Sequence, residues 1–432
     1  MLRRRARAVA RDINRTSSPR TYSQNVPQYH PKVRAIPFAF SKEAAIRHVG
    51  LAASVGCLFR NFLGSLGAKY IGGNFQPIQP IRIQPVYFPA WFLDSEVESY
   101  MNDGDSERQR TVTAYFNNCY LPGAAFDLLG RLALRNDQVE PSLAVPFSQS
   151  LIHQHGSDVV CMPYTINPLD VISRARTSSF TSDEDVRSEL RFIKTNIEAT
   201  YPVLIPLYLA QFPMVPPFES STFVIEAYSQ PGRFFIQVAQ TPEVSEEDRF
   251  DLEKYIGYDF LFLGDAPSSH AETRVLAPDF DKNASANVAS WFDRLFSEPG
   301  GAEKLVHPDG AVGVNAHMDD PRVREWTAEE VNPVRQWMNQ GQAIVQLKDV
   351  VKNLTSIENQ MQSGAVEVTQ WPPPPESEPK QGIEIVTAGL EAFIKSELSK
   401  LEMLEQTRAD TAPEWWRQRE ETKHQPGGSE PM

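Results

Sequence analysis

The sequence predicts an α+β protein, with a mixed or antiparallel sheet body interrupted by prolines and a C-terminal helical arm of two amphipathic helices. Residues 33–296 contain short apolar runs separated by Pro and Gly, which is typical of strands and turns. Residues 321–408 instead carry apolar residues at helical spacing. The best hairpin consists of 222–228 and 233–238, because Pro231-Gly232 between them supplies the central residues of a type II turn.

Composition divides the 432 residues into segments. We assign residues 1–22 to a mitochondrial transit peptide, 23–320 to the α+β body and 321–408 to the helical arm. A polyproline spacer at 371–379 divides the arm, since consecutive prolines adopt the extended polyproline II conformation. Residues 409–432 are rich in Pro, Gly and charge, which predicts a disordered tail. The sequence leaves open whether the body is one domain or two.

The first 22 residues differ in charge from the rest of the chain. They hold seven Arg, one Asp and no Glu, a net charge of +6 in a chain whose total is −13. An Arg-rich, Ser-bearing, acid-poor composition is typical of a mitochondrial transit peptide. Arg20, Tyr22 and Ser23 resemble the R-x-Tyr-Ser motif at which mitochondrial processing ends many presequences. We therefore expect the import machinery to bind residues 1–22 and to deliver the protein to the mitochondrial matrix; a basic disordered tail or a nucleic-acid arm is the alternative.

Charge and hydropathy exclude several other partners. The excess of acidic residues after residue 22 argues against binding to nucleic acid, whose phosphates require clustered Lys and Arg. No apolar run reaches the length of about 18 residues that a membrane span needs, so we expect no transmembrane segment. Cys57, Cys119 and Cys161 form no C-x-x-C pair, which fits a reducing compartment and excludes a disulfide scaffold.

The body is expected to begin with a helix capped by Ser41 and to continue into a proline-rich strand. In that strand β-forming residues alternate with Pro80, Pro85 and Pro89. Because proline cannot donate a ladder hydrogen bond, we expect an edge strand, a bulge, or a strand that bends at each proline. Its aromatic residues are predicted to fill the core rather than to form a ligand platform: Tyr87, Phe88, Trp91 and Phe92.

One pattern, P-V-x-x-P-x-aromatic-apolar, occurs at 85–92 and again at 202–209. The two strands could lie side by side or occupy equivalent places in the fold. A chance match is the alternative, because repeat architectures need at least three copies.

Three blocks also follow one another in a recognisable order: IPFAFSKEA at 36–44, VYFPAWFLD at 86–94, and the strand at 202–209 leading into the hairpin. Over roughly residues 33–240 this order resembles bacterial zinc-ribbon-bearing proteins of unassigned activity. The chain also resembles fungal mitochondrial proteins of unknown role with the same PVYFPAWF core. The resemblance implies a shared fold but no reaction. The bacterial proteins begin with paired cysteines for zinc, which this chain lacks, so their zinc site is not carried over.

The candidate metal ligands are His153, His155 and Cys161. Residues two apart on a strand share a face, so both imidazoles could point at one ion. A structural zinc site needs four ligands, however, and only Asp158 or Cys119 could complete the set. Exposed or core histidines are the preferred interpretation, and we expect no metal site.

The candidate acid–base groups are Asp94, Glu96 and Glu98, which alternate along the chain and could share one face with raised pKa values. In this acidic chain, a solvated strand end or the first turn of a helix is the preferred interpretation. The sequence holds no nucleophile elbow, phosphate-binding loop, dinucleotide fingerprint or H-E-x-x-H helix. We therefore expect no catalytic residue and no cofactor.

The arm carries an apolar seam that could bind a protein partner. Its heptad core positions are apolar apart from Gln340 and Glu358, and its central residues are Trp337, Ile344, Leu347, Val351 and Leu354. The seam could pack on the second helix, on the body or on another subunit, and intramolecular packing ranks first. Trp415 and Trp416, in the polar tail, are candidate anchors for a partner's pocket.

Two functions of different classes remain open. The leading one is a soluble, non-catalytic mitochondrial matrix protein that binds protein partners through its C-terminal helices and supports the assembly or organisation of a larger mitochondrial complex. The alternative is an enzyme or small-ligand-binding protein with a pocket between the aromatic proline-rich strands, using Asp94, Glu96, His153 and His155.

Overall fold

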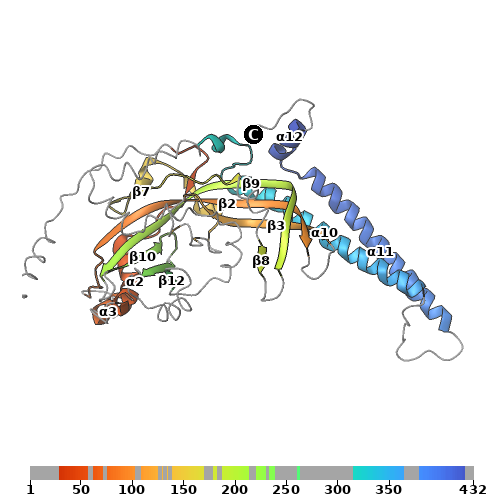
Figure 1. Cartoon of the computed structure of the whole chain (residues 1–432), viewed down its shortest axis with the longest axis horizontal. Helices are drawn as coiled ribbons and strands as arrows, with labels where there is room; N and C mark the ends of the chain where they lie inside the picture. The colour runs from red at the N-terminus through yellow and green to blue at the C-terminus, as the bar shows by residue number, and fades with distance from the viewer. Residues whose placement is uncertain are drawn as a thin grey trace, which may run out of the picture.

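The computed structural model describes residues 29–56, 62–71, 75–102, 109–124, 129, 134, 139–169, 179–181, 187–213, 220–229, 233–238, 260–262, 315–363 and 379–423. Within them the chain forms a mixed, mostly antiparallel sheet, followed by two long C-terminal helices that extend away from the sheet (Figure 1). The predicted α+β class is confirmed. The expected transit peptide, with Arg20, Tyr22 and Ser23, and the four consecutive prolines of the spacer lie outside the described residues.

Two very long antiparallel strands form the centre of the sheet. β2 (Arg82–Asn102) and β9 (Arg187–Pro213) pair along the whole length of β2. The other edge of β2 pairs with β7 (Val160–Cys161) and β3 (Gln109–Pro122). The other edge of β9 pairs in turn with β8 (Ser179–Thr181), with Val323, with β1 (Arg34–Ala35) and with β10 (Ser220–Glu226).

The remaining strands extend this sheet or stand beside it. β11 (Phe234–Val238) pairs with β10 and β12 (Phe260–Phe262) pairs with β11, while β4 (Val145–Pro146) pairs with β1. β5 (His153–Gln154) and β6 (Ser157–Asp158) form a separate two-stranded sheet. The antiparallel pairing of β10 with β11 confirms the predicted hairpin, whose Pro231-Gly232 lies outside the described residues.

The two copies of the proline pattern lie side by side, with Pro85 opposite Tyr208 and Trp91 opposite Pro202. The carbonyl of Pro89 accepts a hydrogen bond from the Gly123 N–H at 2.8 Å, on the side of β2 away from β9. In a strand the N–H and C=O of one residue point to the same edge. Pro85 and Pro89 are four residues apart, so both lack an N–H on that outer edge.

The same arrangement holds for β9, where the carbonyl of Pro206 accepts from the Ala227 N–H at 3.0 Å, away from β2. The β2–β9 ladder therefore loses no donor to proline, and both strands occupy the centre of the sheet. The expectation of an edge strand or of a bulge at each proline is wrong. The register shifts between β2 and β9 instead lie between Glu96 and Ser99.

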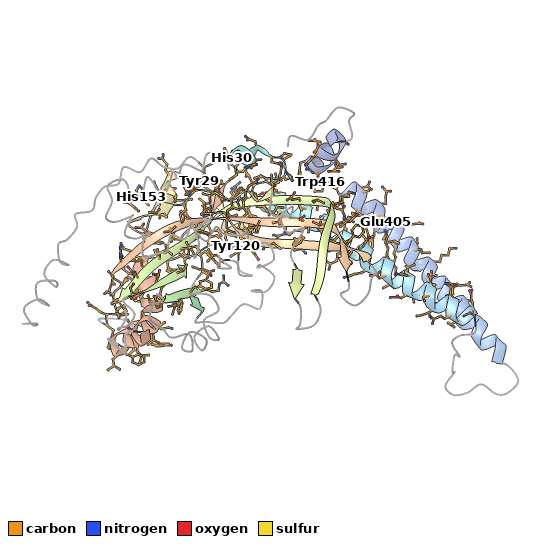
Figure 2. All side chains as sticks on the ribbon, in the orientation of Figure 1. Tyr29, His30, Tyr120, His153, Glu405 and Trp416 are labelled. Carbon is orange, nitrogen blue, oxygen red and sulfur yellow. The ribbon has the colours of Figure 1, made fainter. Side chains whose placement is uncertain are left out.

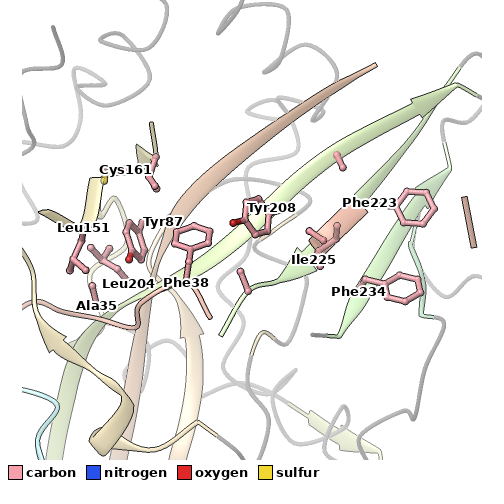
Figure 3. Close-up of a cluster of buried hydrophobic side chains, with 14 of the residues drawn as sticks. Ala35, Phe38, Tyr87, Leu151, Cys161, Leu204, Tyr208, Phe223, Ile225 and Phe234 are labelled. Atoms are coloured by element: carbon pink, nitrogen blue, oxygen red, sulfur yellow. The ribbon is translucent and has the colours of Figure 1, made fainter. Parts of the chain in front are cut away.

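Both faces of the β2–β9 pair are buried. On the face that we call the arm face, Phe88 and Phe92 pack in one core, and the ring of Trp326 stacks on Phe92 with centroids 4.7 Å apart. On the opposite face, Tyr87 and Trp91 pack in a second core with the aromatic side chains seen in Figure 3. These four aromatic residues are fully buried, so the core-filling prediction is confirmed.

Helices cover the sheet at its two ends. α2 (Lys42–Gly56) and α3 (Phe62–Tyr70) lie at the end away from the arm (Figure 1). The Ser41 hydroxyl accepts a hydrogen bond from the Ala44 N–H at 3.4 Å, as expected of a cap. Short 3-10 helices are η1 (Pro141–Leu143), η2 (Gln149–Ile152) and η7 (Asn315–Asp319).

The arm consists of α10 (Ala328–Gln362) and α11 (Pro379–Asp410), which lie side by side, and is followed by α12 (Glu414–Lys423) (Figure 1). α11 begins at a proline, a residue favoured at the first helical position. α12 falls within the segment 409–432, for which the composition predicts a disordered tail. That prediction is wrong for 414–423, because aromatic residues of α12 pack on the arm-face core.

The outward placement of the prolines predicts an asymmetry between neighbouring positions. We expect Ile205→Pro to lower the free energy of unfolding by about 3 kcal/mol more than Ile205→Ala, because the Ile205 N–H faces β2. Pro206→Ala should lower the free energy of unfolding by no more than about 1 kcal/mol, since the Pro206 nitrogen faces away from the β2–β9 ladder. Urea unfolding measures all three variants. Equal losses from Ile205→Pro and Ile205→Ala would contradict the arrangement.

Candidate functional site

The arm meets the sheet at two buried ion pairs. Asp94 and Glu96 of β2 are 0% and 1% exposed and follow Phe92 at alternating positions. Arg335 of α10 donates from Nε to Asp94 Oδ2 at 3.0 Å. Arg408 of α11 donates from Nη2 to both carboxylate oxygens of Glu96, at 2.7 and 2.6 Å. These four residues, which we call the arm junction, connect each long helix to the same strand.

Asp94 is held by an irregularity in β3. The pairing of β2 with β3 shifts between Leu93 and Ser95, and Asn118 adopts a left-handed backbone with φ of 50°. An extra residue in one strand re-aims its backbone, and Asn tolerates this conformation better than most residues. The Asn118 N–H thereby donates to Asp94 Oδ1. Burial raises the pKa of Asp94, and the Arg335 charge and this hydrogen bond partly offset the rise.

Glu96 lies among polar groups from three other elements. Asn196 of β9 donates to its Oε1 at 2.9 Å. Tyr115 of β3 lies nearby, and its burial, with the Glu96 charge, raises the tyrosine pKa to about 12. The guanidinium of Arg408 also stacks on the Trp337 ring, 3.9 Å from its centroid. Charge-assisted hydrogen bonds from Nη2 and the stacked Trp337 ring thus hold the half-buried guanidinium against Glu96.

Gly341 of α10 leaves the space through which Arg408 reaches the sheet. A Cβ at this position would lie 2.6 Å from Arg408 Cζ and 2.6 Å from Glu96 Oε2. Such distances are far below a van der Waals contact, so no larger residue fits without displacing the ion pair. Close approach of this kind is a common reason for glycine inside a helix.

The expectation of a solvated face for Asp94 and Glu96 is wrong. Their partners are 241 and 312 residues away along the chain, so no local pattern indicates the pairing. The signals missed were Arg335 and Gly341 in α10 and Arg408 in α11, which follows Leu401 at heptad spacing. The geometry suits a structural connection, since each carboxylate is occupied by an arginine and both are shielded from water.

A second set of ion pairs fixes the segment that leads into α10. Arg322 donates to Glu198 of β9 at 2.8 Å and to Asp320 at 2.8 Å. Its backbone carbonyl accepts from the Thr200 N–H at 2.9 Å, while the Arg324 N–H donates to the Thr200 carbonyl at 2.9 Å. Burial raises the pKa of Glu198, and the Arg322 charge opposes that rise. The start of the arm is therefore attached to β9 as well as to β2.

The seam of the arm packs inside this chain. Ile344 is 5% exposed, and Leu347, Val351 and Leu354 are half-buried on α10. Gln340, a polar exception in the heptad pattern, accepts a hydrogen bond from the Thr411 hydroxyl at 2.7 Å. This contact and the Lys348–Glu405 pair at 2.7 Å show that α11 runs antiparallel to α10. The intramolecular packing ranked first from the sequence is what the structure contains.

The two tryptophans of α12 also face inward. Trp416 is 5% exposed in the arm-face core, and Trp415 and Trp337 pack partly buried against that core. Arg324 lies over the Trp415 ring and Arg419 over the Trp416 ring, at 5.5 and 4.9 Å from the centroids. Trp416, a candidate anchor for a partner's pocket, is covered by its own chain in this structure.

No family model, no curated protein and no solved structure matches this chain. Of the helices in the described ranges, none combines the length and the hydropathy required to cross a bilayer.

The candidate metal ligands are dispersed. His153 is exposed and pairs with Asp158 at 2.7 Å, while His155 lies in the following turn with φ of 49° and contacts the Phe38 carbonyl at 3.3 Å. Cys161 is buried in the core that contains Tyr87 and Trp91, and burial raises its pKa to about 12. Among the described residues, no three His, Cys, Asp or Glu side chains are placed to hold one ion.

An open groove of about 480 Å³ runs beside the arm junction. It is formed by β9, α10, α11 and α12, and its lining includes Lys194, Ile344, Glu405, Arg408 and Trp416. Figure 2 shows Glu405 and Trp416 at the base of the arm. Neither Asp94 nor Glu96 lines it. The groove therefore does not bring the two carboxylates into contact with a bound molecule.

The close approach at Gly341 gives a direct test against a matched glycine. We expect Gly341→Ala to lower the free energy of unfolding by about 1–3 kcal/mol, because the added methyl displaces Arg408. Gly389 in α11 has nothing within 4 Å of its Cβ position. Gly389→Ala should therefore be neutral or raise stability by up to about 1 kcal/mol. Urea unfolding followed by circular dichroism measures both, and equal effects would contradict the close contact.

Burial of Cys161 predicts an unreactive thiol. In a Cys57→Ser/Cys119→Ser variant, the remaining thiol should react with a disulfide reagent at least about 100-fold more slowly in the native protein than in urea, since thiolate is the reacting species. A native rate equal to that in urea would show an accessible thiol and would restore Cys161 as a candidate ligand.

Proposed function

We propose that this protein is a soluble, non-catalytic protein of the mitochondrial matrix that binds protein partners through its helical arm and supports the assembly or organisation of a larger mitochondrial complex. The observation that carries the proposal is a two-helix arm that extends from the sheet and is attached to it by buried ion pairs. A projecting element that is fixed at its base can present a binding surface in a defined orientation.

The surface we assign to the partner is the outer side of α10. Val350 and Ile357 lie seven residues apart, and hence on the same side of the helix, with 44% and 46% of their surface exposed. The half-buried seam residues Leu347, Val351 and Leu354 are used by the antiparallel packing on α11 and are assigned to the fold. Partner helices recognise apolar residues at this spacing.

Localisation to the mitochondrial matrix is supported by the Arg-rich, acid-poor composition of residues 1–22 and by the processing motif at Arg20, Tyr22 and Ser23. The pocket between aromatic strands, which the alternative function needs, is not favoured by any observation. Tyr87, Phe88, Trp91 and Phe92 pack in the core, and the two histidines lie in a separate small sheet or its turn.

Partner binding is tested by changing the outer side of α10. In mitochondrial extract the tagged wild-type protein should migrate with a large assembly in size-exclusion chromatography, and Val350→Gln/Ile357→Gln should shift most of it to the size of the free protein. The unfolding midpoint should stay unchanged, since both positions are exposed. Leu143→Gln, at an exposed apolar residue of η1, is the control and should not shift. Migration of the wild type as a free small oligomer would contradict the proposal.

Import is tested separately. A reporter that carries residues 1–22 should enter isolated mitochondria and become shorter, because a cationic amphipathic leader is driven inward by the membrane potential. The same reporter with every arginine of the leader changed to glutamine should stay outside. Delivery of the trimmed chain, starting at Ser23, to the matrix would show that the address lies elsewhere.

A further inference from the structure

The end of the molecule away from the arm carries a cluster of exposed apolar side chains. Leu63, Tyr70 and Ile71 are 76%, 69% and 76% exposed, the three highest values for large apolar residues in the described part of the chain. Phe75 and Ile81 are also exposed. All five belong to α3 or to the segment between α3 and β2, and we call them the α3 patch. α3 lies at the far end of the sheet in Figure 1.

The patch is built on a packed support. The inner side of α3 contacts the segment that follows it, where the Ser65 hydroxyl accepts from the Ile78 N–H at 3.2 Å. A Cβ on Gly67 would lie 2.4 Å from the Phe75 ring, so this ring sits against the helix backbone. Leu63 and Tyr70 are seven residues apart and share the outer side of the helix. The side chains point outward because the inner side is already used.

The local charge is opposite to that of the whole protein. Between Glu43 and Asp94 the sequence contains no acidic residue and four basic ones, in a chain with a net charge of −13. One of the four, Lys69, lies exposed within the patch, with its Nζ 5.6 Å from the centroid of the Tyr70 ring. Exposed apolar residues and positive charge therefore coincide at one end of an acidic molecule.

We propose that the α3 patch binds the surface of an anionic lipid bilayer. Aliphatic side chains and a tyrosine can enter the boundary between head groups and acyl chains, while Lys69 contacts lipid phosphates. Each basic residue near an anionic bilayer adds attraction, and the acid-free segment adds no repulsion. Nucleic acid fits less well, because phosphate binding calls for clustered arginines and lysines rather than leucine and isoleucine. The protein thus docks on a membrane without crossing it.

The proposal is tested by sedimentation of the full chain with lipid vesicles. We expect binding to vesicles of phosphatidylcholine mixed with phosphatidylserine, little binding to vesicles of phosphatidylcholine alone, and weaker binding as salt is raised. Leu63→Gln/Ile71→Gln and Lys69→Glu should each reduce the bound fraction about tenfold at limiting lipid. Because these side chains are exposed, the variants should keep the wild-type unfolding midpoint.

Two substitutions on the arm are the matched controls. Met403→Gln removes a 62% exposed apolar side chain from α11, and Lys352→Glu reverses an exposed charge on α10. Both should bind vesicles as the wild type does. Equal sedimentation with and without anionic vesicles, or equal losses in the arm variants, would overturn the proposal. Self-association of the wild type that Leu63→Gln/Ile71→Gln abolishes, without vesicle binding, would overturn it in favour of a contact between copies of this chain.

Discussion

The fold depends on two carboxylates that are buried on one strand. Asp94 and Glu96 are removed from water, and an unpaired carboxylate in such a place would cost several kcal/mol, about 3–5 when one partner of a buried pair is removed. Each is compensated by an arginine from a different helix of the arm. The arm can therefore dock on the sheet in only one alignment, the one that satisfies both carboxylates together.

Along one side of the long strand β2, apolar residues are followed by acidic residues. Phe88 and Phe92 contribute apolar surface to the arm-face core. Asp94 and Glu96 follow on the same side of the strand and bind the two arginines of the arm. The change from apolar to acidic residues occurs at the register shift in β3, where the Asn118 N–H donates to Asp94. The outward prolines leave the central ladder complete. A strand of this length can thus connect the apolar core to the ionic base of the arm.

Local patterns predicted much of this structure. The α+β class, the Ser41 cap, the β10–β11 hairpin and the apolar seam of α10 each follow from spacing along a short stretch of chain. The edge prediction for β2 failed because a proline removes a donor from only one edge of a strand. The spacing of four residues puts Pro85 and Pro89 on the same edge, and the register with β9 turns that edge outward. The ion pairs could not be predicted, since nothing near Asp94 or Glu96 indicates arginines hundreds of residues away. The tail prediction failed because composition ignores the tertiary packing of Trp416.

The central claim is that the Glu96–Arg408 pair fixes the arm on the sheet. A double-mutant cycle of Glu96→Gln and Arg408→Gln, measured by urea unfolding, tests it most directly. The buried pair should give a coupling energy of about 3 kcal/mol, within the range measured for close desolvated charge pairs. The exposed Lys348–Glu405 pair is the reference and should give less than about 1 kcal/mol. A Glu96–Arg408 coupling no larger than that of the reference would contradict the account.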